Sequence, residues 1–593
     1  MKKRYGSIAI LLAASLILAA CSSSSEAAQT ESGEESTLIS SEYTQSSSAA
    51  TAQSATSIDV ENVFSNRDLS GEYDADECET ITLSDSGVSA SGSGVTTDGS
   101  TVTITAEGTY IIEGSLSDGM IIVDADKSEK VQLVLNGVSI TSASSAPIYV
   151  KQADKVFITL ADGTVNTLTN GGEFVAIDDN NIDAVIFSKD DLTLNGTGKL
   201  TITSPAGHGI VSKDELVITN GAYTITAASQ GLSGKEIVAI ANGSFNITAG
   251  KDAIHSFDDD DSTVGCVYIE DGSFNLAAES DGISAMNEIC ISGGSLTVTE
   301  SYEGIEACVI NISGGTIDIT SSDDGLNATD KRTDSQSGSG GFGGGNDTQE
   351  DACVNISGGV ISINAQGDGI DSNGYISVSG GELYIAGSTN SSDGALDYGL
   401  LAEVSGGIVV AAGQSGMAMN FGSSSTQGSI LVNTQTQQSA GTTIALMDSD
   451  GTQLLSLTAK KSYNSVVISC PEIEDGGTYT VKTGDDETQV TMDGLIYGNG
   501  SGMGGMGGGG FGGGGRGGMR GQNAPDDSGE KPDGEAPNGE NPGGEAPNGE
   551  RPDGEAPNGE KPDGEAPNGQ MPGGGGPGGG RGGMMQKGAE GES

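Results

Sequence analysis

A Gly-containing bend recurs through the middle of the chain, and its spacing constrains the fold more than any other feature. In its fullest form the bend reads Ile-Ser-Gly-Gly, and successive copies follow at intervals of 22, 29, 22, 21, 44, 22 and 26 residues. Its second Gly position is occupied by Gly221, Gly243, Gly272, Gly294, Gly315, Gly359, Gly381 and Gly407. A unit of about 22 residues that sometimes carries an insertion is typical of a solenoid, in which each repeat forms one coil.

Apolar and polar residues alternate on both sides of each bend. Val354 and Ile356 precede Gly359, for example, and Ile361 and Ile363 follow it. A period of two predicts short strands with one buried face, and the Gly pair marks the turn between two of them. Helical spacing is absent from this region, so the sequence predicts an all-β chain that folds as a parallel β-helix.

Changes in composition divide the chain into five predicted parts. We expect a lipoprotein signal peptide over residues 1–21, a Ser/Thr-rich stalk over 22–57, the parallel β-helix over 58–424, a small antiparallel β module over 425–497 that caps the last coil, and a disordered tail over 498–593. The first coils, from Ile58 onward, are expected to be irregular. The tail consists of Gly-rich sequence and Pro/Asn/Gly/Glu repeats, a composition typical of disordered segments.

The N-terminus has the pattern of an export signal. Lys2, Lys3 and Arg4 precede an apolar run, which ends in Leu-Ala-Ala-Cys at Cys21. This ending resembles a bacterial lipobox, so we expect Cys21 to carry a lipid; the alternative is a plain signal peptide with an incidental Cys. The protein is therefore predicted to be extracytoplasmic and attached to the bacterial cell membrane by lipid only.

The net charge of −58 makes some partners improbable. Such a field repels nucleic acid and attracts cations, so we expect no nucleic-acid partner. A large acidic excess also keeps a surface protein soluble, and this simpler explanation remains open.

A second repeated phrase places an acid before Gly and a small or branched apolar residue. It occurs at Asp281, Glu303, Asp324, Asp368 and Asp393, and Asp252 holds the same position one coil earlier. In a parallel β-helix these carboxylates stack about 4.8 Å apart. Two bare carboxylates at this distance repel each other by about 1 kcal/mol in water and by more near a protein surface, so the stack needs a counter-charge, and nearby Lys and Arg are scarce.

Further oxygen ligands follow each acid by three or four residues. Carboxylate and amide oxygens together favour Ca²⁺, although acids that cap turns through backbone N–H groups give the same pattern. The predicted Ca²⁺ ligands are Asp252, Asp281, Glu303, Glu306, Asp323, Asp324, Asn327, Asp368, Asp371, Asp393 and Asp397.

Several motifs together resemble a known family. They are the lipobox, Asn66-Arg67-Asp68-Leu69, Leu135-Asn136-Gly137-Val138, the Asp-Gly-Ile phrases and the Ser-Gly-Gly bends. The chain is similar over residues 58–497 to the bacterial cell-surface β-helix proteins described as carbohydrate-binding domain-containing, of the clostridial cellulose- and acid-sugar-binding type. The resemblance implies a right-handed parallel β-helix like that of pectate lyases, bound Ca²⁺ and binding of uronic-acid polymers.

We therefore expect a non-catalytic protein that binds polysaccharide, either polygalacturonate or a cellulose-like polymer. A Ca²⁺-dependent polysaccharide lyase is the main alternative; it would need a Lys or Arg base beside the metal, for which Lys251 is a candidate. A surface adhesin or scaffold is the third. Five tyrosines could stack on sugar rings, and the sequence does not choose among Tyr223, Tyr268, Tyr302, Tyr375 and Tyr384.

Overall fold

The computed structural model describes residues 58–258, 261, 263–331 and 348–498. The chain divides into two units, residues 1–509 and 510–593, and every described residue belongs to the first. The regular structure of the described part is nearly all strand, joined by turns and bends, and its one α-helix with given bounds is the four-residue α1 (Asn66–Leu69). None of its helices is long and apolar enough to cross a membrane.

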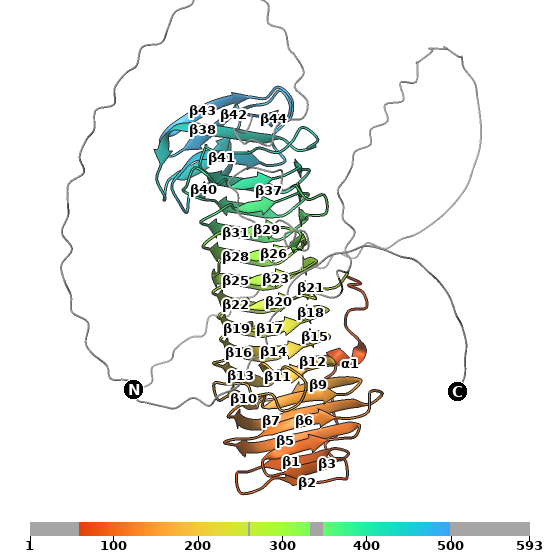
Figure 1. Cartoon of the computed structure of the whole chain (residues 1–593). Coiled ribbons are helices and arrows are strands. Elements are labelled where there is room, and N and C mark those ends of the chain that lie inside the picture. The colour runs from red at the N-terminus through yellow and green to blue at the C-terminus, as the bar shows by residue number, and fades with distance from the viewer. Residues whose placement is uncertain (1–57, 259–260, 262, 332–347, 499–593) are drawn as a thin grey trace, which may run out of the picture. The chain divides into compact units, whose positions relative to one another are not determined.

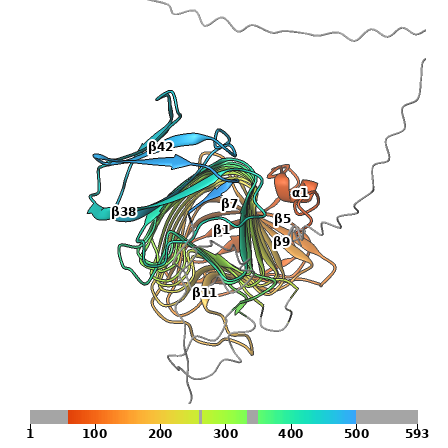
Figure 2. The same ribbon diagram turned by 90° about the horizontal axis from the view of Figure 1, so that it is seen from above.

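Three ladders of parallel strands stack along one axis and form the three sides of a coil (Figures 1 and 2). We call them the strap face, the long face and the acid face, in the order in which the chain visits them within a coil. The strap face consists of β9 (Lys155–Leu160), β12 (Asp191–Gly196), β15 (Glu215–Ile218), β18 (Ile237–Ile240), β21 (Cys266–Ile269), β24 (Glu288–Ile291), β27 (Val309–Ile312), β30 (Cys353–Ile356), β33 (Tyr375–Val378) and β36 (Leu401–Val404).

The long face holds the longest strands, and the acid face most of the shortest. Two long strands, β5 (Gly108–Leu116) and β7 (Lys130–Ser142), span two faces: their first halves continue the strap-face ladder together with β1 (Glu79–Leu83), and their second halves begin the long face. The rest of the long face consists of β10 (Val165–Asn170), β13 (Lys199–Ser204), β16 (Ala222–Ala227), β19 (Ser244–Ala249), β22 (Ser273–Ala278), β25 (Ser295–Glu300), β28 (Thr316–Ser321), β31 (Val360–Ala365), β34 (Glu382–Ala386) and β37 (Ile408–Gly413). The acid face consists of β4 (Thr101–Ile104), β6 (Met120–Asp124), β8 (Ile148–Gln152), β11 (Ala184–Ser188), β14 (His208–Ser212), β17 (Leu232–Gly234), β20 (Ile254–Ser256), β23 (Ile283–Ala285), β26 (Ile305–Ala307), β29 (Leu326–Ala328), β32 (Ile370–Ser372) and β35 (Leu396–Tyr398).

The core fills the inside of the coil. Inward residues of successive strands stand directly above one another, as in the series Ile225, Ile247, Leu276 and Val298 on the long face. All four are buried in one apolar cluster that runs through the coils. The strict alternation seen in the sequence therefore sets the register, because a shift by one residue would turn this series outward.

The second-position Gly is required at every bend by backbone conformation, and from Gly293 onward space requires a Gly before it as well. All eight Gly residues at the second position have positive φ, for example 87° at Gly359. At the preceding position, a Cβ added to Gly358 would lie 2.2 Å from the carbonyl oxygen of Ser313 in the neighbouring coil. The later bends therefore stack backbone on backbone, and there only Gly fits both positions; the first three bends have Asn220, Asn242 and Asp271 at the first position.

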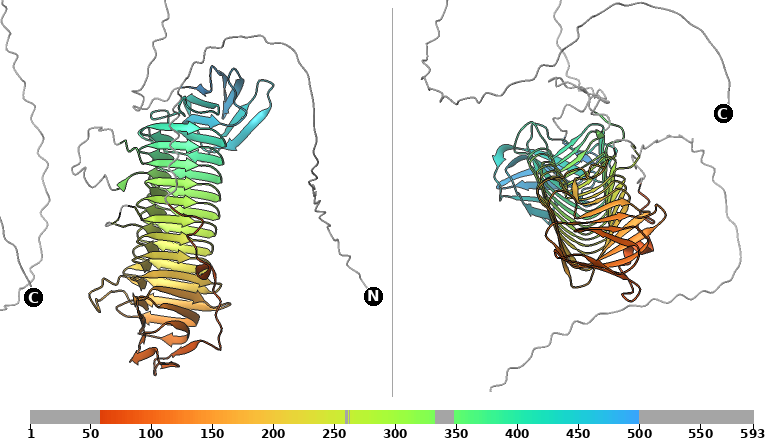
Figure 3. Two further views of the ribbon diagram at one scale, coloured as in Figure 1. Left: turned by 90° about the vertical axis from the view of Figure 1, so that its right-hand side faces the viewer. Right: turned by 60° about the horizontal axis from the view of Figure 1, so that its bottom comes forward.

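Antiparallel strands close both ends of the stack. At the first coils, β2 (Ser89–Ala90) pairs with β1 and β3 (Val95–Asp98) pairs with β4. The C-terminal module contains β38 (Ser429–Gln438), β39 (Thr443–Met447), β40 (Gln453–Thr458), β41 (Tyr463–Ser469), β42 (Thr478–Thr483), β43 (Asp486–Thr491) and β44 (Ile496–Tyr497). In it β41 pairs antiparallel with β37, so the module covers the edge of the last coil (Figure 3).

The predicted parallel β-helix and its antiparallel module are confirmed. The beginning of the solenoid differs from the expectation, because residues 58–78 contain no strand and the first coil starts at β1. The predicted signal peptide, the stalk and nearly all of the tail lie outside the described residues.

Residues 58–70 instead form a strap that runs along the outside of the strap face. At its beginning Ile58 and Phe64 pack on Cys266, Tyr268 and Cys290 of β21 and β24, and the rings of Phe64 and Tyr268 lie 5.8 Å apart. At its end, α1 lies against β12.

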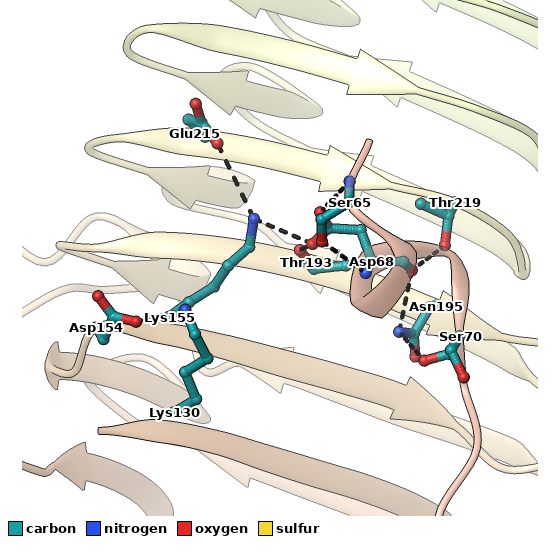
Figure 4. A network of polar contacts seen from close by, with 10 residues as sticks. All are labelled: Ser65, Asp68, Ser70, Lys130, Asp154, Lys155, Thr193, Asn195, Glu215 and Thr219. Carbon is teal, nitrogen blue, oxygen red and sulfur yellow. Dashed lines mark hydrogen bonds and ion pairs between the residues drawn. The ribbon is translucent and has the colours of Figure 1, made fainter. Parts of the chain in front are cut away.

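Asp68 of α1 fastens the strap through a buried polar network (Figure 4). Its carboxylate accepts hydrogen bonds from the Ser65 hydroxyl at 2.6 Å and the Thr193 hydroxyl at 2.6 Å, and it pairs with Lys155 Nζ at 3.0 Å. Asp68 is only 2% exposed. Burial acts to raise its pKa, but the hydrogen bonds from Ser65 and Thr193 and the charge of Lys155 outweigh it, so the pKa lies below its ordinary value.

The backbone next to Asp68 is held as well. Thr219 Oγ1 donates to the Asp68 carbonyl at 2.7 Å, and Asn195 Nδ2 donates to the carbonyls of Asp68 and Ser70 at 3.2 and 3.0 Å. These donors come from the strap face, where β12 contributes Asn195 and the residue after β15 contributes Thr219. The strap is thus built into the side of the coil stack.

Candidate functional site

The repeated acids form two parallel columns on and beside the acid face. The first column lies just before the strands, where backbone hydrogen bonds link Asp252, Asp281, Glu303, Asp324 and Asp368 from coil to coil. The second column lies within the strands, where the register places His255, Ser284, Glu306, Asn327, Asp371 and Asp397 one above another. The structure therefore brings together nine of the predicted ligands.

The remaining two predicted ligands lie in a row that flanks the first column. Asp323 precedes Asp324, and Asp393 precedes Gly394, which is the residue in register with Asp368. Asp393 accepts hydrogen bonds from the hydroxyls of Ser388 and Ser392, both at 3.0 Å. These two acids therefore lie one residue before the first column in the sequence, in a row next to it.

Three acids come close enough together to hold one metal ion. Asp281, Glu303 and Glu306 each offer a carboxylate oxygen, and these oxygens lie within 4.8 Å of one another. Burial and the neighbouring Glu306 raise the pKa of Asp281, and burial followed by Glu306 raises the pKa of Glu303. The local field at this triad strongly favours a positive charge.

A residue that the sequence analysis did not assign supplies part of that charge. Lys331 Nζ forms an ion pair with Glu306, lies 4.0 Å from Asp281 and donates to the Ser284 hydroxyl at 2.7 Å. Lys331 follows β29 on the edge of the chain insertion, far in sequence from the triad. The expectation that no basic residue serves the columns was therefore wrong at this place, since a side chain from a neighbouring loop reaches across two coils.

The N-terminal end of the columns has its own partner. His255 Nδ1 lies 2.8 Å from a carboxylate oxygen of Asp252. Burial acts to raise the pKa of Asp252, but the hydrogen bond and charge of His255 lower it to about 2. Asp252 thus has an imidazole nitrogen as its partner at this end of the columns.

The C-terminal half of the columns is different. Within the described residues, no Lys, Arg or His nitrogen lies within 4.0 Å of the carboxylates of Asp324, Asp368, Asp371 or Asp397. Burial, followed by neighbouring acids, raises the pKa of Asp368 to about 8 and that of Asp371 to about 7; burial raises that of Asp324 to about 6. These carboxylates repel one another, and a cation would relieve the repulsion.

Some acids also cap the turns, as the alternative explanation required. An oxygen of Asp324 accepts the Asp368 backbone N–H at 2.6 Å, and Asp252 accepts the Asp281 backbone N–H at 3.2 Å. Asp368 accepts the N–H of Gly394. Capping uses one oxygen of a carboxylate and leaves the second for another ligand.

Asn327 has a buried side-chain oxygen with no hydrogen-bond partner. It is 9% exposed, and its Nδ2 donates to Glu303 at 2.8 Å, but its Oδ1 has no hydrogen-bond partner. The register places this amide between Glu306 and Asp371 in the second column. A buried carbonyl oxygen without a partner costs free energy, so this oxygen is available as a ligand atom.

The matched family agrees with this geometry. Residues 98–347 match the model of the family described as carbohydrate-binding domain-containing protein. This part of the chain is therefore similar to the family that its sequence motifs indicated. The match covers the strap-face, long-face and acid-face strands from β4 to β29, and Asp368, Asp371 and Asp397 lie beyond it.

Two known proteins are similar to parts of the chain. A carbohydrate-binding domain-containing protein of Acetivibrio thermocellus is 45% identical over 126 residues, which are 21% of this chain and 44% of that relative. The match thus spans less than half the length of the relative. A solved structure described as a polysaccharide lyase-like protein from C. thermocellum, a gadolinium derivative, is 36% identical with a TM-score of 0.39, over 40% of this chain and 96% of that one.

Proposed function

We propose that this chain is a cell-surface lipoprotein that binds an acidic polysaccharide through Ca²⁺ held on the acid face. The unpartnered, buried Asn327 Oδ1, between Glu306 and Asp371 in the second column, is the observation that carries the proposal. The family that residues 98–347 match is described by carbohydrate binding, which supports the choice of a saccharide ligand.

The donor set suits Ca²⁺. Carboxylate and amide oxygens are hard ligands, and Ca²⁺ takes six to eight of them in flexible geometry. In the C-terminal half, Asn327, Asp324, Asp368 and Asp371 would hold the ion. In the N-terminal half, Asp281, Glu303 and Glu306 are the matching set, with Lys331 already in contact. A Ca²⁺ held on an open face supplies free coordination positions for the carboxylate of a uronate, so an acidic protein can bind an acidic polymer.

The direct test is whether a polymer held in a gel slows the migration of the protein. We expect polygalacturonate in a native gel to retard residues 58–498 when millimolar Ca²⁺ is present and not when EDTA is present. No ultraviolet absorbance from an unsaturated uronate is expected over several hours. Absence of retention on any uronate or glucan, with the fold intact, would leave adhesion or scaffolding as the function.

A polysaccharide lyase is the second candidate, and Lys331 is the observation that favours it. An elimination needs a basic side chain beside the metal to remove a proton, and Lys331 lies there, whereas the expected Lys251 forms no ion pair within the described residues. The Lys331 ammonium is, however, already engaged in an ion pair with Glu306. A steady rise in absorbance that Lys331→Ala abolishes would favour the lyase.

The lipid anchor is proposed on the lipobox at Cys21 and is tested separately. Cys21→Ala is expected to move the protein from the membrane fraction to the medium or to leave the precursor unprocessed, because no other attachment is proposed. Ser22→Ala, next to the cleavage position, is the matched control and should not change the distribution. Unchanged membrane retention and processing of the Cys21 variant would refute the anchor.

A further inference from the structure

A row of residues flanks the first acid column and fixes the position of one tyrosine. The Tyr302 backbone N–H donates to the Ser280 carbonyl at 2.6 Å, and its carbonyl accepts the Asp323 N–H at 2.8 Å. The Gly367 N–H continues the row by donating to Asp323 at 2.9 Å. Tyr302 therefore lies in register with its neighbours, directly before Glu303 of the first column.

The structure separates Tyr302 from the other tyrosines that the sequence offered as sugar contacts. Tyr223 and Tyr268 are buried, at 2% and 5% exposure. Tyr375 packs on the buried Cys308 and Cys353, and Tyr384 packs on the core of the C-terminal module. Tyr302 is 51% exposed, and it is the one of the five beside the acid columns.

The surroundings of Tyr302 leave its ring accessible and hold its hydroxyl. Its neighbours in the row are the small Ser280 on one side and Asp323, followed by Gly367, on the other. A Cβ at Gly367 would lie 2.5 Å or less from carboxylate oxygens of Asp323 and Asp324, so the missing side chain gives these acids their space. A hydrogen bond from its hydroxyl to Asp323, and then the charge of Asp323, raise the pKa of Tyr302 to about 12.

We propose that the Tyr302 ring is the platform on which one sugar ring of the bound polysaccharide stacks, next to the acid columns. The inference rests on the proposed function and assigns a residue to it. A pyranose has an apolar face of C–H groups and an edge of hydroxyl groups. An exposed Tyr presents a rigid apolar surface at low entropic cost, while the carboxylates of the columns are acceptors for the hydroxyl edge of the sugar.

Exposed apolar surface alone does not distinguish a ligand platform from an ordinary surface residue. The distinction here comes from two independent observations, which are the exposure of Tyr302 and the unpartnered Asn327 Oδ1 of the proposed ion site on the next coil. Tyr73, also exposed at 38%, has no such neighbours in the columns and serves as the matched control.

The test compares Tyr302→Ala, Tyr302→Phe and Tyr73→Ala in affinity gels that contain polygalacturonate and Ca²⁺. Tyr302→Ala is expected to weaken retention by about tenfold or more, the effect of losing one aromatic anchor. Tyr302→Phe keeps the ring and is expected to bind within about threefold of the unsubstituted protein, since a surface hydrogen bond contributes little. Tyr73→Ala should bind normally.

Thermal unfolding with and without Ca²⁺ separates the two proposals. Tyr302→Ala is expected to keep the full Ca²⁺-dependent shift in Tm, because Tyr302 is not a proposed ligand of the ion. Retention of Tyr302→Ala equal to that of the unsubstituted protein overturns the platform and leaves the proposed function standing. Loss of the Ca²⁺ shift in this variant also overturns it, as the ring would then support the acid face. Failure of the unsubstituted protein to bind polymer refutes the proposed function itself.

Discussion

Asp68→Ala is expected to detach the strap and to lower the free energy of its docking by about 3–5 kcal/mol, the usual cost of breaking a buried charged pair from one side. The substitution leaves the Lys155 ammonium without its buried partner and removes the acceptor of the Ser65 and Thr193 hydroxyls. Because the strap covers an outer face, the first consequence is local opening and not collapse of the coils.

Amide hydrogen exchange measures this opening. Amides around Thr193 and Thr219 should exchange roughly a hundredfold faster or more, since each 1.4 kcal/mol corresponds to a factor of ten. Asp68→Ala combined with Lys155→Met should recover part of the loss, because no charge is then left unpaired. Asp59→Ala, an exposed acid in the same segment, is the control and should change exchange little. Equal protection in Asp68→Ala and the unsubstituted protein would contradict the role of the network.

The acid columns should make the metal-free protein less stable as the pH rises. The pKa values of Asp324, Asp368 and Asp371 in the folded state, about 6, 8 and 7, lie above their unfolded values of about 4. Between these limits the folded state binds more protons, so the free energy of unfolding falls as pH increases from about 4 to about 8. Tm in EDTA is therefore expected to decrease steadily over this range.

Ca²⁺ should replace the protons and remove most of this dependence. An ion that binds only the folded state stabilises it by mass action, and its binding should release protons. Asp368→Asn with Asp371→Asn is expected to raise Tm in EDTA at pH 8 and to blunt the Ca²⁺ shift, because two repelling charges and two ligands are lost together. Glu107→Gln with Glu270→Gln removes two exposed charges and should leave both properties nearly unchanged. A Tm that is the same with Ca²⁺ and with EDTA at every pH would refute the proposed cation site.

The fold could be predicted from the sequence because each repeat of about 22 residues forms one coil of the solenoid. A bend every 22 residues fixes the length of a coil, and the spacing from Asp281 to Ser284 and from Glu303 to Glu306 then places two columns side by side. Such predictions need only the regular stacking of equivalent positions.

The contacts made by irregular segments could not be predicted in this way. Lys331 lies 25 residues from Glu306, and its contact depends on how the chain leaves β29 and not on the repeat. Asp68 appeared only as part of a recognised motif, since nothing in the local sequence shows that it meets Thr193, 125 residues away. The choice of Tyr302 among five tyrosines likewise required knowledge of burial.

The position of the strap determines where a pulling force would enter the molecule. The chain reaches the solenoid at Ile58 beside β21 and β24, is held again at Asp68 beside β12, and only then turns to the first strand at Glu79. Tension arriving from the residues before Ile58 would therefore load the apolar contacts and the Asp68 network in shear across several middle coils at once. The first coils, with their short antiparallel strands, would carry none of that load until the strap had failed.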